Sequence, residues 1–267
     1  MGKKILKGLC LEDYRHPAER SAFSKLAQMD LVGKSLDWIA KKAIEEFVEI
    51  EEMGTNIQIS DSCLSDINSL VSYAAQISDT QNTPRSFVKW CYDFYLTTNG
   101  IKNPIIVINS GFFDLLTSEE QLFMLGHEMG HIRSQHLRFL ILCKYWYSFA
   151  DSIPGSSLLM IPLFYWSRMT DLTADRVALL TCQNIDIAIT TMMKLSGVPR
   201  CLYNQMDPKS FYQQIDDFRL LLKNENKLIE KISVLDNAAP WLVNRASELL
   251  KWYESGEYNQ IIQKYGM

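Results

Sequence analysis

Paired cysteines, long apolar runs and a strong excess of one charge are all missing from this 267-residue sequence. Its six cysteines are scattered and form no C-x-x-C pair, so we expect reduced thiols and a cytoplasmic protein. The 27 basic and 31 acidic residues are interspersed, and without a basic stripe nucleic acid is not an expected partner. The N-terminus lacks an apolar run long enough for a signal peptide.

A membrane span is also not expected. The best candidate, Ser152–Ser167, is uncharged but is shorter than the roughly 20 apolar residues of a span, and two prolines and a glycine interrupt it. The apolar stretch Leu137–Ala150 before it carries Arg138 and Lys144. We interpret both stretches as core-facing or interfacial, and contact with a membrane surface through residues 137–167 stays open.

Helical spacing dominates the rest of the chain. Hydrophobic residues make up 47 % and charged residues 22 %, which is ample for a core. Residues 1–53 look helical apart from a polar connection over Asp13–Arg20, and Cys63–Ile77 returns to helical spacing. One long helical run is predicted over about Ser118–Phe149, and further helices follow from Tyr165 onward.

Strand signals are few. Thr55–Ser60 alternates weakly, and the β-prone runs Phe94–Thr98 and Ile105–Asn109 flank the turn signal Asn99-Gly100. The latter two runs could pair as a hairpin, and Ile105–Asn109 could present an edge to an extended peptide. We expect a mainly α fold with a small β-sheet (α+β), packed as a single domain over 1–267. We divide it into an N-terminal helical part (1–80), a core (85–200) and C-terminal helices (201–267).

The chain's chemistry centres on the segment His127-Glu128-Met129-Gly130-His131, which has the form H-E-x-x-H. Residues four apart share one face of a helix, so His127 and His131 can aim two imidazole nitrogens at one zinc ion. Glu128 lies about 100° around the helix, where it can take a proton from a water molecule. Thr117 or Ser118 starts this helix, and either would form a capping box.

Histidine is otherwise scarce, with four in the chain. His136 is five residues past His131, so on a continuous helix it points about 140° away and cannot easily join the same metal. We interpret it as a surface residue or as one behind the ligands. His16, beside Pro17, is expected to be solvated.

A two-histidine site needs a third protein ligand. No glutamate occurs between Glu128 and Glu225, so a carboxylate from the following helices must be aspartate. Asp171 and Asp175 are four apart and share one helix face. One could bind metal while the other holds an imidazole by its second N–H, although a solvated or capping pair fits the spacing equally well.

Two separated segments, Leu125–Ile132 and Trp166–Leu180, resemble the zinc metallopeptidase family forty-eight, which includes the HtpX-like membrane proteases and the CAAX prenyl proteases. The resemblance runs from about Tyr95 to Tyr258 and is strongest to the soluble bacterial branch. It implies a zincin-like (gluzincin) metallopeptidase fold, one zinc ion per chain, and a catalytic core that holds both metal motifs.

The resemblance also implies roles for individual residues. His127 and His131 would bind the metal and Glu128 would be the general base. The family motif E-x-x-A-D falls on the segment from Asp171 to Asp175, which makes Asp171 the third ligand and Asp175 the carboxylate that orients a zinc-bound histidine. Here the usual glutamate ligand is an aspartate. A Thr-His-Pro common near the family's C-terminus is replaced by Ala238-Ala239-Pro240, followed by Arg245.

The sequence therefore predicts a zinc metalloendopeptidase that hydrolyses peptide bonds in peptide or protein substrates, with a metal-activated water and Glu128 as base. The alternative is a catalytically weak or inactive metal-binding or interaction protein that keeps the peptidase fold, and Asp171 motivates it.

Overall fold

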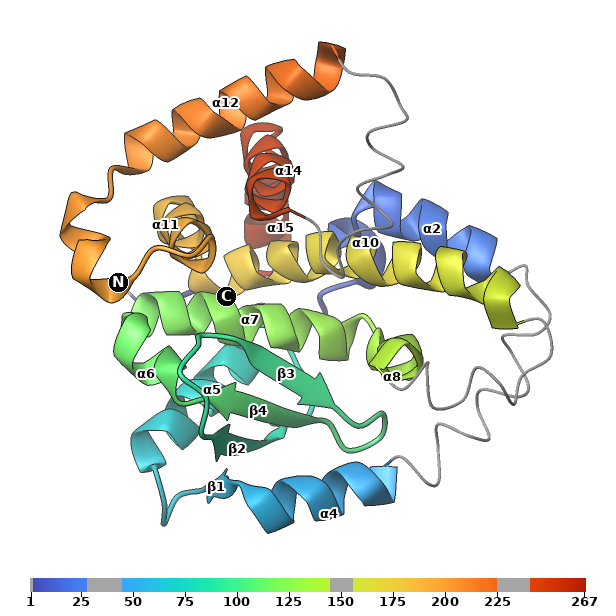
Figure 1. Ribbon diagram of the computed structural model, residues 1–267, viewed down its shortest axis with the longest axis vertical. Coiled ribbons are helices and arrows are strands. Elements are labelled where there is room, and N and C mark those ends of the chain that lie inside the picture. The colour runs from blue at the N-terminus through green and yellow to red at the C-terminus, as the bar shows by residue number, and fades with distance from the viewer. Residues whose placement is uncertain (1, 28–44, 145–155, 225–240) are drawn as a thin grey trace.

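The computed structural model describes residues 2–27, 45–144, 156–224 and 241–267. Within these ranges helices predominate around one small sheet, so the predicted mainly α fold with a small β-sheet is confirmed (Figure 1). The elements in chain order are α1 Leu11–Tyr14, α2 Pro17–Ala27, α4 Glu45–Thr55, β1 Ile57–Ile59, α5 Ser65–Ile77, β2 Arg85–Lys89, β3 Leu96–Asn99, β4 Ile105–Asn109, α6 Gly111–Leu115, α7 Ser118–Arg133, α8 Leu137–Lys144, α10 Ser156–Cys182, α11 Ile185–Leu195, the 3-10 helix η3 Arg200–Gln205, α12 Pro208–Asn224, α14 Leu242–Glu254 and α15 Glu257–Tyr265.

Strand β4 lies inside the sheet. The strand order is β1-β2-β4-β3, with β4 parallel to β2 and antiparallel to β3. The predicted hairpin of β3 and β4 is confirmed, with Leu96 opposite Ile108. The prediction that β4 presents an edge is wrong, because both of its edges are paired. The sheet ends instead in β1 and β3. Strand β2 is not among the predicted strands, since Phe87 and Val88 are its only apolar residues.

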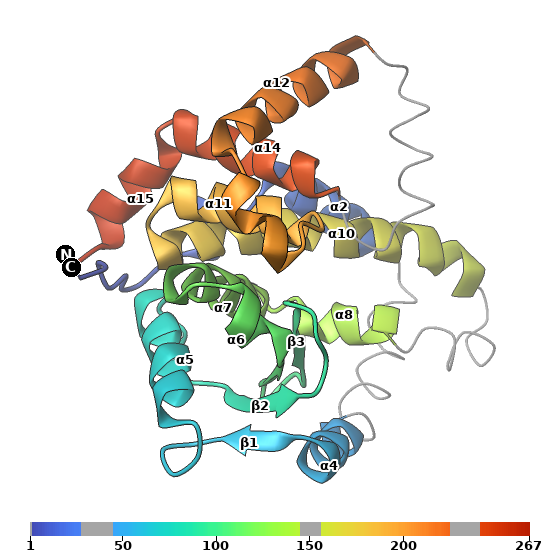
Figure 2. The ribbon, with the colours of Figure 1, turned by 60° about the vertical axis from the view of Figure 1, so that its left-hand side comes forward.

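The side chains of β4 alternate between two cores, as the two-residue period of a strand requires. Ile106 and Ile108 belong to a large cluster that includes the buried residues of α7 and the second half of α10. Ile105 and Val107 belong to a second cluster with α2, α8 and the first half of α10. Helix α7 accordingly lies between the sheet and α10 in both views of the ribbon (Figure 1, Figure 2).

Small residues let α7 and α10 pack closely. A Cβ placed on Gly126 would lie 2.6 Å from the Cβ of Thr181 and 2.9 Å from the Cα of Ala178. Such contacts are too short for a real Cβ atom, so the close approach of the two helices depends on glycine at this position.

The prediction of one continuous helix over Ser118–Phe149 is wrong within the described residues. Helix α7 ends at Arg133, and Gln135 adopts the left-handed conformation with φ of +56°. Helix α8 then begins at Leu137. The break changes the direction of the chain, so His136 does not follow the helical rotation assumed from the sequence. Residues 145–149 of the predicted helix lie outside the described ranges.

The N-terminal region also differs from its prediction. The polar connection expected over Asp13–Arg20 is instead made of α1 and the first turn of α2. His16, expected to be solvated, is only 7 % exposed, and its backbone N–H donates to Thr173 Oγ1 at 3.1 Å. Its Nδ1 accepts from the N–H of Ala18 at 3.1 Å, which caps the start of α2. The helix predicted over residues 28–44 lies outside the described residues.

No helix in the described residues is long and apolar enough to cross a bilayer. From Ser156 onward the uncharged stretch before Ser167 forms the start of α10, and its residues Leu163 and Trp166 are buried. The remainder of that stretch lies outside the described residues, and contact of 137–167 with a membrane surface stays a prediction.

Candidate metal centre

Helix α7 begins at the predicted capping box. Thr117 Oγ1 accepts from the backbone N–H of Glu120 at 3.4 Å, and the Glu120 carboxylate accepts from the N–H of Thr117 at 2.8 Å. Glu120 is buried and also accepts from Lys194 Nζ of α11 at 2.7 Å. These contacts hold the start of α7, and the H-E-x-x-H segment follows about two turns later.

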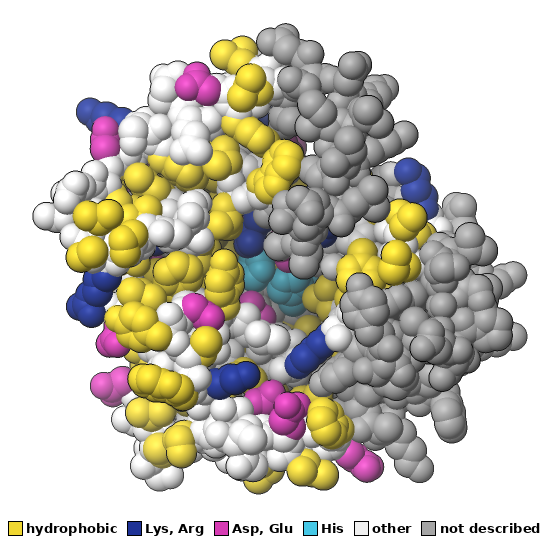
Figure 3. Space-filling model, in the orientation of Figure 1, with side chains coloured by type: hydrophobic (Ala, Val, Ile, Leu, Met, Phe, Trp, Pro, Cys, Tyr) yellow, Lys and Arg dark blue, Asp and Glu magenta, His cyan; other side chains and the backbone are white. Residues whose placement is uncertain are grey.

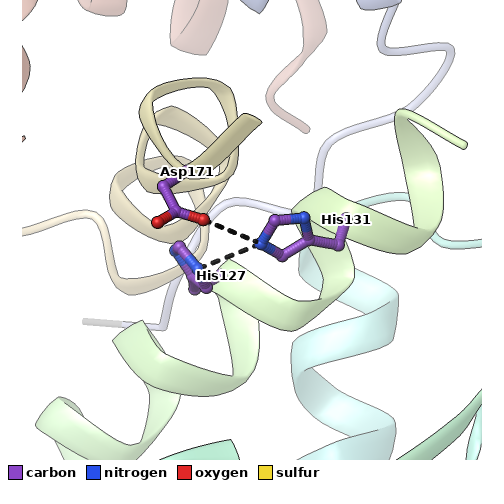
Figure 4. Close-up of side chains that lie close together, drawn as sticks. All are labelled: His127, His131 and Asp171. Atoms are coloured by element: carbon purple, nitrogen blue, oxygen red, sulfur yellow. Dashed lines mark hydrogen bonds and ion pairs between the residues drawn. The ribbon is translucent and has the colours of Figure 1, made fainter. Parts of the chain in front are cut away.

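Three potential metal ligands converge where α7 faces α10. The Nε2 atoms of His127 and His131 are 3.1 Å apart, and Asp171 Oδ1 lies 3.6 Å from His131 Nε2 (Figure 4). The three donor atoms all lie within 4.8 Å of one another. Ligands held tetrahedrally at about 2.0–2.2 Å from zinc are roughly 3.3–3.6 Å apart, so the observed spacing suits one ion. Two imidazoles and one carboxylate are also a ligand set typical of catalytic zinc.

Asp175 lies behind His127. Its Oδ1 is 2.9 Å from His127 Nδ1, and the Arg245 guanidinium of α14 donates to both carboxylate oxygens at 2.7 and 2.9 Å. Burial opposes ionisation of Asp175, but the charge of Arg245 and the hydrogen bonds from Arg245 and His127 outweigh it and lower its pKa to about 2. An ionised Asp175 orients the His127 ring with Nε2 toward the ligand cluster.

His136 lies behind the second histidine in the same way. Its Nδ1 is 3.1 Å from His131 Nδ1, and its side chain is 2 % exposed. Its ring contacts the ring of Trp166 edge-on, with centroids 5.7 Å apart. Burial lowers its pKa to about 3, so the ring is neutral and one nitrogen can accept a hydrogen bond. Of the two interpretations left open, the surface position is wrong.

Glu128 is a buried carboxylate and Asp171 a partly buried one. Burial raises the pKa of Glu128, although the charge of His127 and a hydrogen bond from Thr98 partly oppose this effect. Burial likewise raises the pKa of Asp171, against the charge of Arg245. Burial also lowers the pKa of His131 well below its usual value, which keeps that imidazole neutral. For His127 burial lowers the pKa, but the hydrogen bond and charge of Asp175 outweigh burial and raise it. A divalent cation between these groups would favour ionised carboxylates and would take the place of the His127 proton, so the donor types and their spacing fit a metal.

The cluster lies at the bottom of a cleft of about 500 Å³. In the space-filling view the histidine side chains are visible at the base of this hollow (Figure 3). Strand β3 and Gly100 form one wall of the cleft, and α8, Leu195 and Arg245 contribute to the others. The three potential metal ligands are therefore open to a substrate although they are largely buried.

The structure brings His127, His131 and Asp171 together and places Asp175 and Glu128 beside them, while the functional roles of all five stay predictions. The contact of His136 with His131 agrees with the interpretation that placed His136 behind the ligands. Its predicted direction is wrong, because the break at Gln135 has no glycine or proline that would indicate it in the sequence. The contact of Thr98 with Glu128 is not among the predictions. Thr98 had a weak signal, since it shares a strand face with the buried Leu96.

A sheet packed on the helix of two histidines, with a third ligand from a following helix, defines the zincin-like class of metallopeptidase folds. The family model for Peptidase family M48 matches residues 74–253, and the chain belongs to this family. The matched region includes every residue of the site described above. The resemblance drawn from the two sequence segments is thereby confirmed.

One curated relative matches over nearly the whole chain. It is "Plastoglobule-localized metallopeptidase 48, chloroplastic" of Arabidopsis thaliana, 26 % identical over 269 residues, which cover 97 % of this chain and 78 % of the relative. No solved structure matches the chain. Membership of a metallopeptidase family thus rests on the family match and this relative together.

Proposed function

We propose that this protein is a zinc-dependent metallopeptidase that hydrolyses peptide bonds. The observation that carries the proposal is the convergence of His127, His131 and Asp171, whose donor atoms lie within 4.8 Å of one another, at the bottom of an open cleft. We propose one zinc ion per chain, since the described residues form one such cluster. The family match supports a metal-dependent peptidase.

When bound, a zinc ion supplies Lewis acidity, which lowers the pKa of a coordinated water to about 7 and polarises the scissile carbonyl. Glu128 takes the proton of the attacking water and delivers it to the leaving nitrogen. Its raised pKa suits the first step, because a more basic carboxylate accepts the proton more readily. Asp175 holds His127 in the tautomer whose Nε2 can bind the metal.

Strand β3 is the proposed place for the substrate backbone. The N–H of Asn109 donates to the carbonyl of Tyr95 at 3.3 Å, so Tyr95 directs its carbonyl toward β4. Alternate residues of an antiparallel strand do the same. Leu96 and Thr98 therefore direct their N–H and C=O groups away from β4, toward the edge that no other described strand pairs. An extended peptide could add along this edge, within the cleft.

The alternative function is a metal-binding or interaction protein that cleaves little. It is motivated by Asp171, whose side chain is one methylene shorter than the usual glutamate ligand. A misplacement of about 1 Å can cost 10²-fold in rate. The 3.6 Å separation between Asp171 and His131 supports the peptidase, because the shorter side chain still reaches the cluster.

One experiment distinguishes the peptidase from the alternative function. Zinc content and turnover of a denatured protein or peptide mixture are measured on purified wild type and on His131→Ala. One zinc per chain with turnover in the wild type, and loss of both in the variant, supports the peptidase. Zinc without turnover favours the alternative, and a wild type that binds no zinc contradicts both.

The remaining expectations about partners and location stay predictions. We propose peptides or proteins as substrates and no nucleic acid. A reducing, cytoplasmic location, expected from the scattered cysteines of the sequence, stays a proposal as well.

A further inference from the structure

Thr98 of β3 contacts the proposed base directly. Its Oγ1 donates a hydrogen bond to Oε2 of Glu128, which is 6 % exposed. We propose that Thr98 is a positioning residue for Glu128, which holds one carboxylate oxygen so that the other faces the water and the leaving nitrogen. This inference rests on the proposed peptidase function.

The chemistry of the two side chains determines the direction of this hydrogen bond. An ionised carboxylate can only accept hydrogen bonds, so the Thr98 hydroxyl must be the donor. A buried carboxylate oxygen that lacks a donor costs free energy, which gives the contact a stabilising effect as well as an orienting one. Of the described residues, Thr98 alone donates a side-chain hydrogen bond to Glu128.

The position of Thr98 gives the contact its functional meaning. Its backbone N–H and C=O face the free edge of β3, where we place the substrate, while its side chain reaches Glu128 of α7. The same residue therefore contacts the substrate backbone and the base. If β3 shifted on α7, the substrate backbone and the Glu128 carboxylate would move together, so their positions relative to one another would be kept.

The test compares two substitutions at Thr98. Thr98→Val keeps the shape and strand propensity but removes the donor, and Thr98→Ser keeps the donor. With the zinc-loaded protein and a peptide substrate, we expect Thr98→Val to lower kcat by roughly 10–100-fold with little change in KM. A loss of this size is typical for residues that hold a side chain of the reaction site in place. Thr98→Ser should restore most of kcat.

Thr83→Val is the matched control, because Thr83 is exposed, precedes β2 and does not line the cleft. It should leave kcat unchanged. A second readout needs no activity. In the metal-free protein, Thr98→Val should lower Tm, and the same substitution should lower Tm by a smaller amount when it is made in the Glu128→Ala variant.

Three results would overturn the inference. An unchanged kcat in Thr98→Val overturns it while the peptidase function stands. Equal losses of Tm in the two backgrounds also overturn it, since the hydroxyl would then not act through Glu128. A zinc-loaded wild type without turnover overturns the peptidase function and this inference together.

Discussion

Gly130 of α7 lies directly against Ala174 of α10. A Cβ placed on Gly130 would be 2.8 Å from the Cα of Ala174 and 3.1 Å from its carbonyl oxygen. The two backbones can be this close only because Gly130 has no side chain. Gly130 precedes His131, and Ala174 is one helical turn beyond Asp171. This contact therefore brings α10 near enough for an aspartate to serve as the proposed third ligand.

Gly130→Ala should therefore affect the metal site as well as the fold. The added methyl must push α10 away, which we expect to destabilise the protein by about 1–3 kcal/mol and to weaken zinc binding. Zinc affinity measured by competition with a chelating dye, beside thermal unfolding, checks both effects.

Gly54→Ala is the control for that experiment. Gly54 lies in α4, and a Cβ added there would meet nothing within 4 Å. This variant should be neutral or more stable by about 0.4–1 kcal/mol, with unchanged zinc affinity. If Gly130→Ala binds zinc as tightly as Gly54→Ala does, the close helix contact does not set the position of Asp171.

Loss of His136 should weaken metal binding without removing a ligand. Its neutral ring can accept a hydrogen bond from His131 Nδ1, which leaves Nε2 of His131 for the metal. We expect His136→Phe to lower zinc affinity by roughly 10–100-fold, and His136→Asn, which keeps an acceptor, to lose less. Equal affinity of the wild type and His136→Phe would show that His131 needs no such support.

Glu248 of α14 makes stability depend on pH. Its Oε2 lies 3.3 Å from His16 Nε2, and Lys251 Nζ donates to Oε1 at 2.6 Å. The hydrogen bond with His16 is the main cause that lowers the pKa of Glu248 to about 2 from 4.5; burial opposes it and Lys251 assists it. Because the folded pKa is lowered, this stabilisation is present above about pH 4.5 and is lost as the pH falls toward 2.

The wild type, freed of metal, should consequently lose Tm more steeply than Glu248→Gln between those pH values. Circular dichroism melts at several pH values measure the slopes. Glu254→Gln on the same helix is the control, since Glu254 pairs with Arg219 only at 3.9 Å and is exposed, and such pairs contribute little. Parallel slopes for the wild type and Glu248→Gln would contradict the account.

Several parts of this fold could be predicted because local signals agree with the tertiary structure. The apolar, β-branched run of β4 predicted a strand. The polar residues at Thr117 and Glu120 predicted a helix start, and the four-residue spacing of the two histidines predicted nitrogens on one face. The four-residue spacing of Asp171 and Asp175 left their roles open, and only the resemblance assigned them.

Other features depend on contacts that a local pattern does not contain. The pairing of both edges of β4 requires β2. The sequence of β2 has only two apolar residues and is as typical of a loop as of a strand. The burial of His16 depends on Thr173 and Glu248, which are far away in the sequence. The left-handed conformation of Gln135 ends α7 without glycine, so His136 was assigned the wrong direction. The division into parts at 1–80, 85–200 and 201–267 stays a prediction.

The central claim is that Glu128 activates water beside a metal held by His127, His131 and Asp171. Its most direct test is peptide turnover by Glu128→Gln and wild type, each at measured zinc content. We predict equal zinc in both proteins and a loss of kcat of about 10²–10⁴-fold in Glu128→Gln. Full turnover by Glu128→Gln with its zinc still bound would contradict the account.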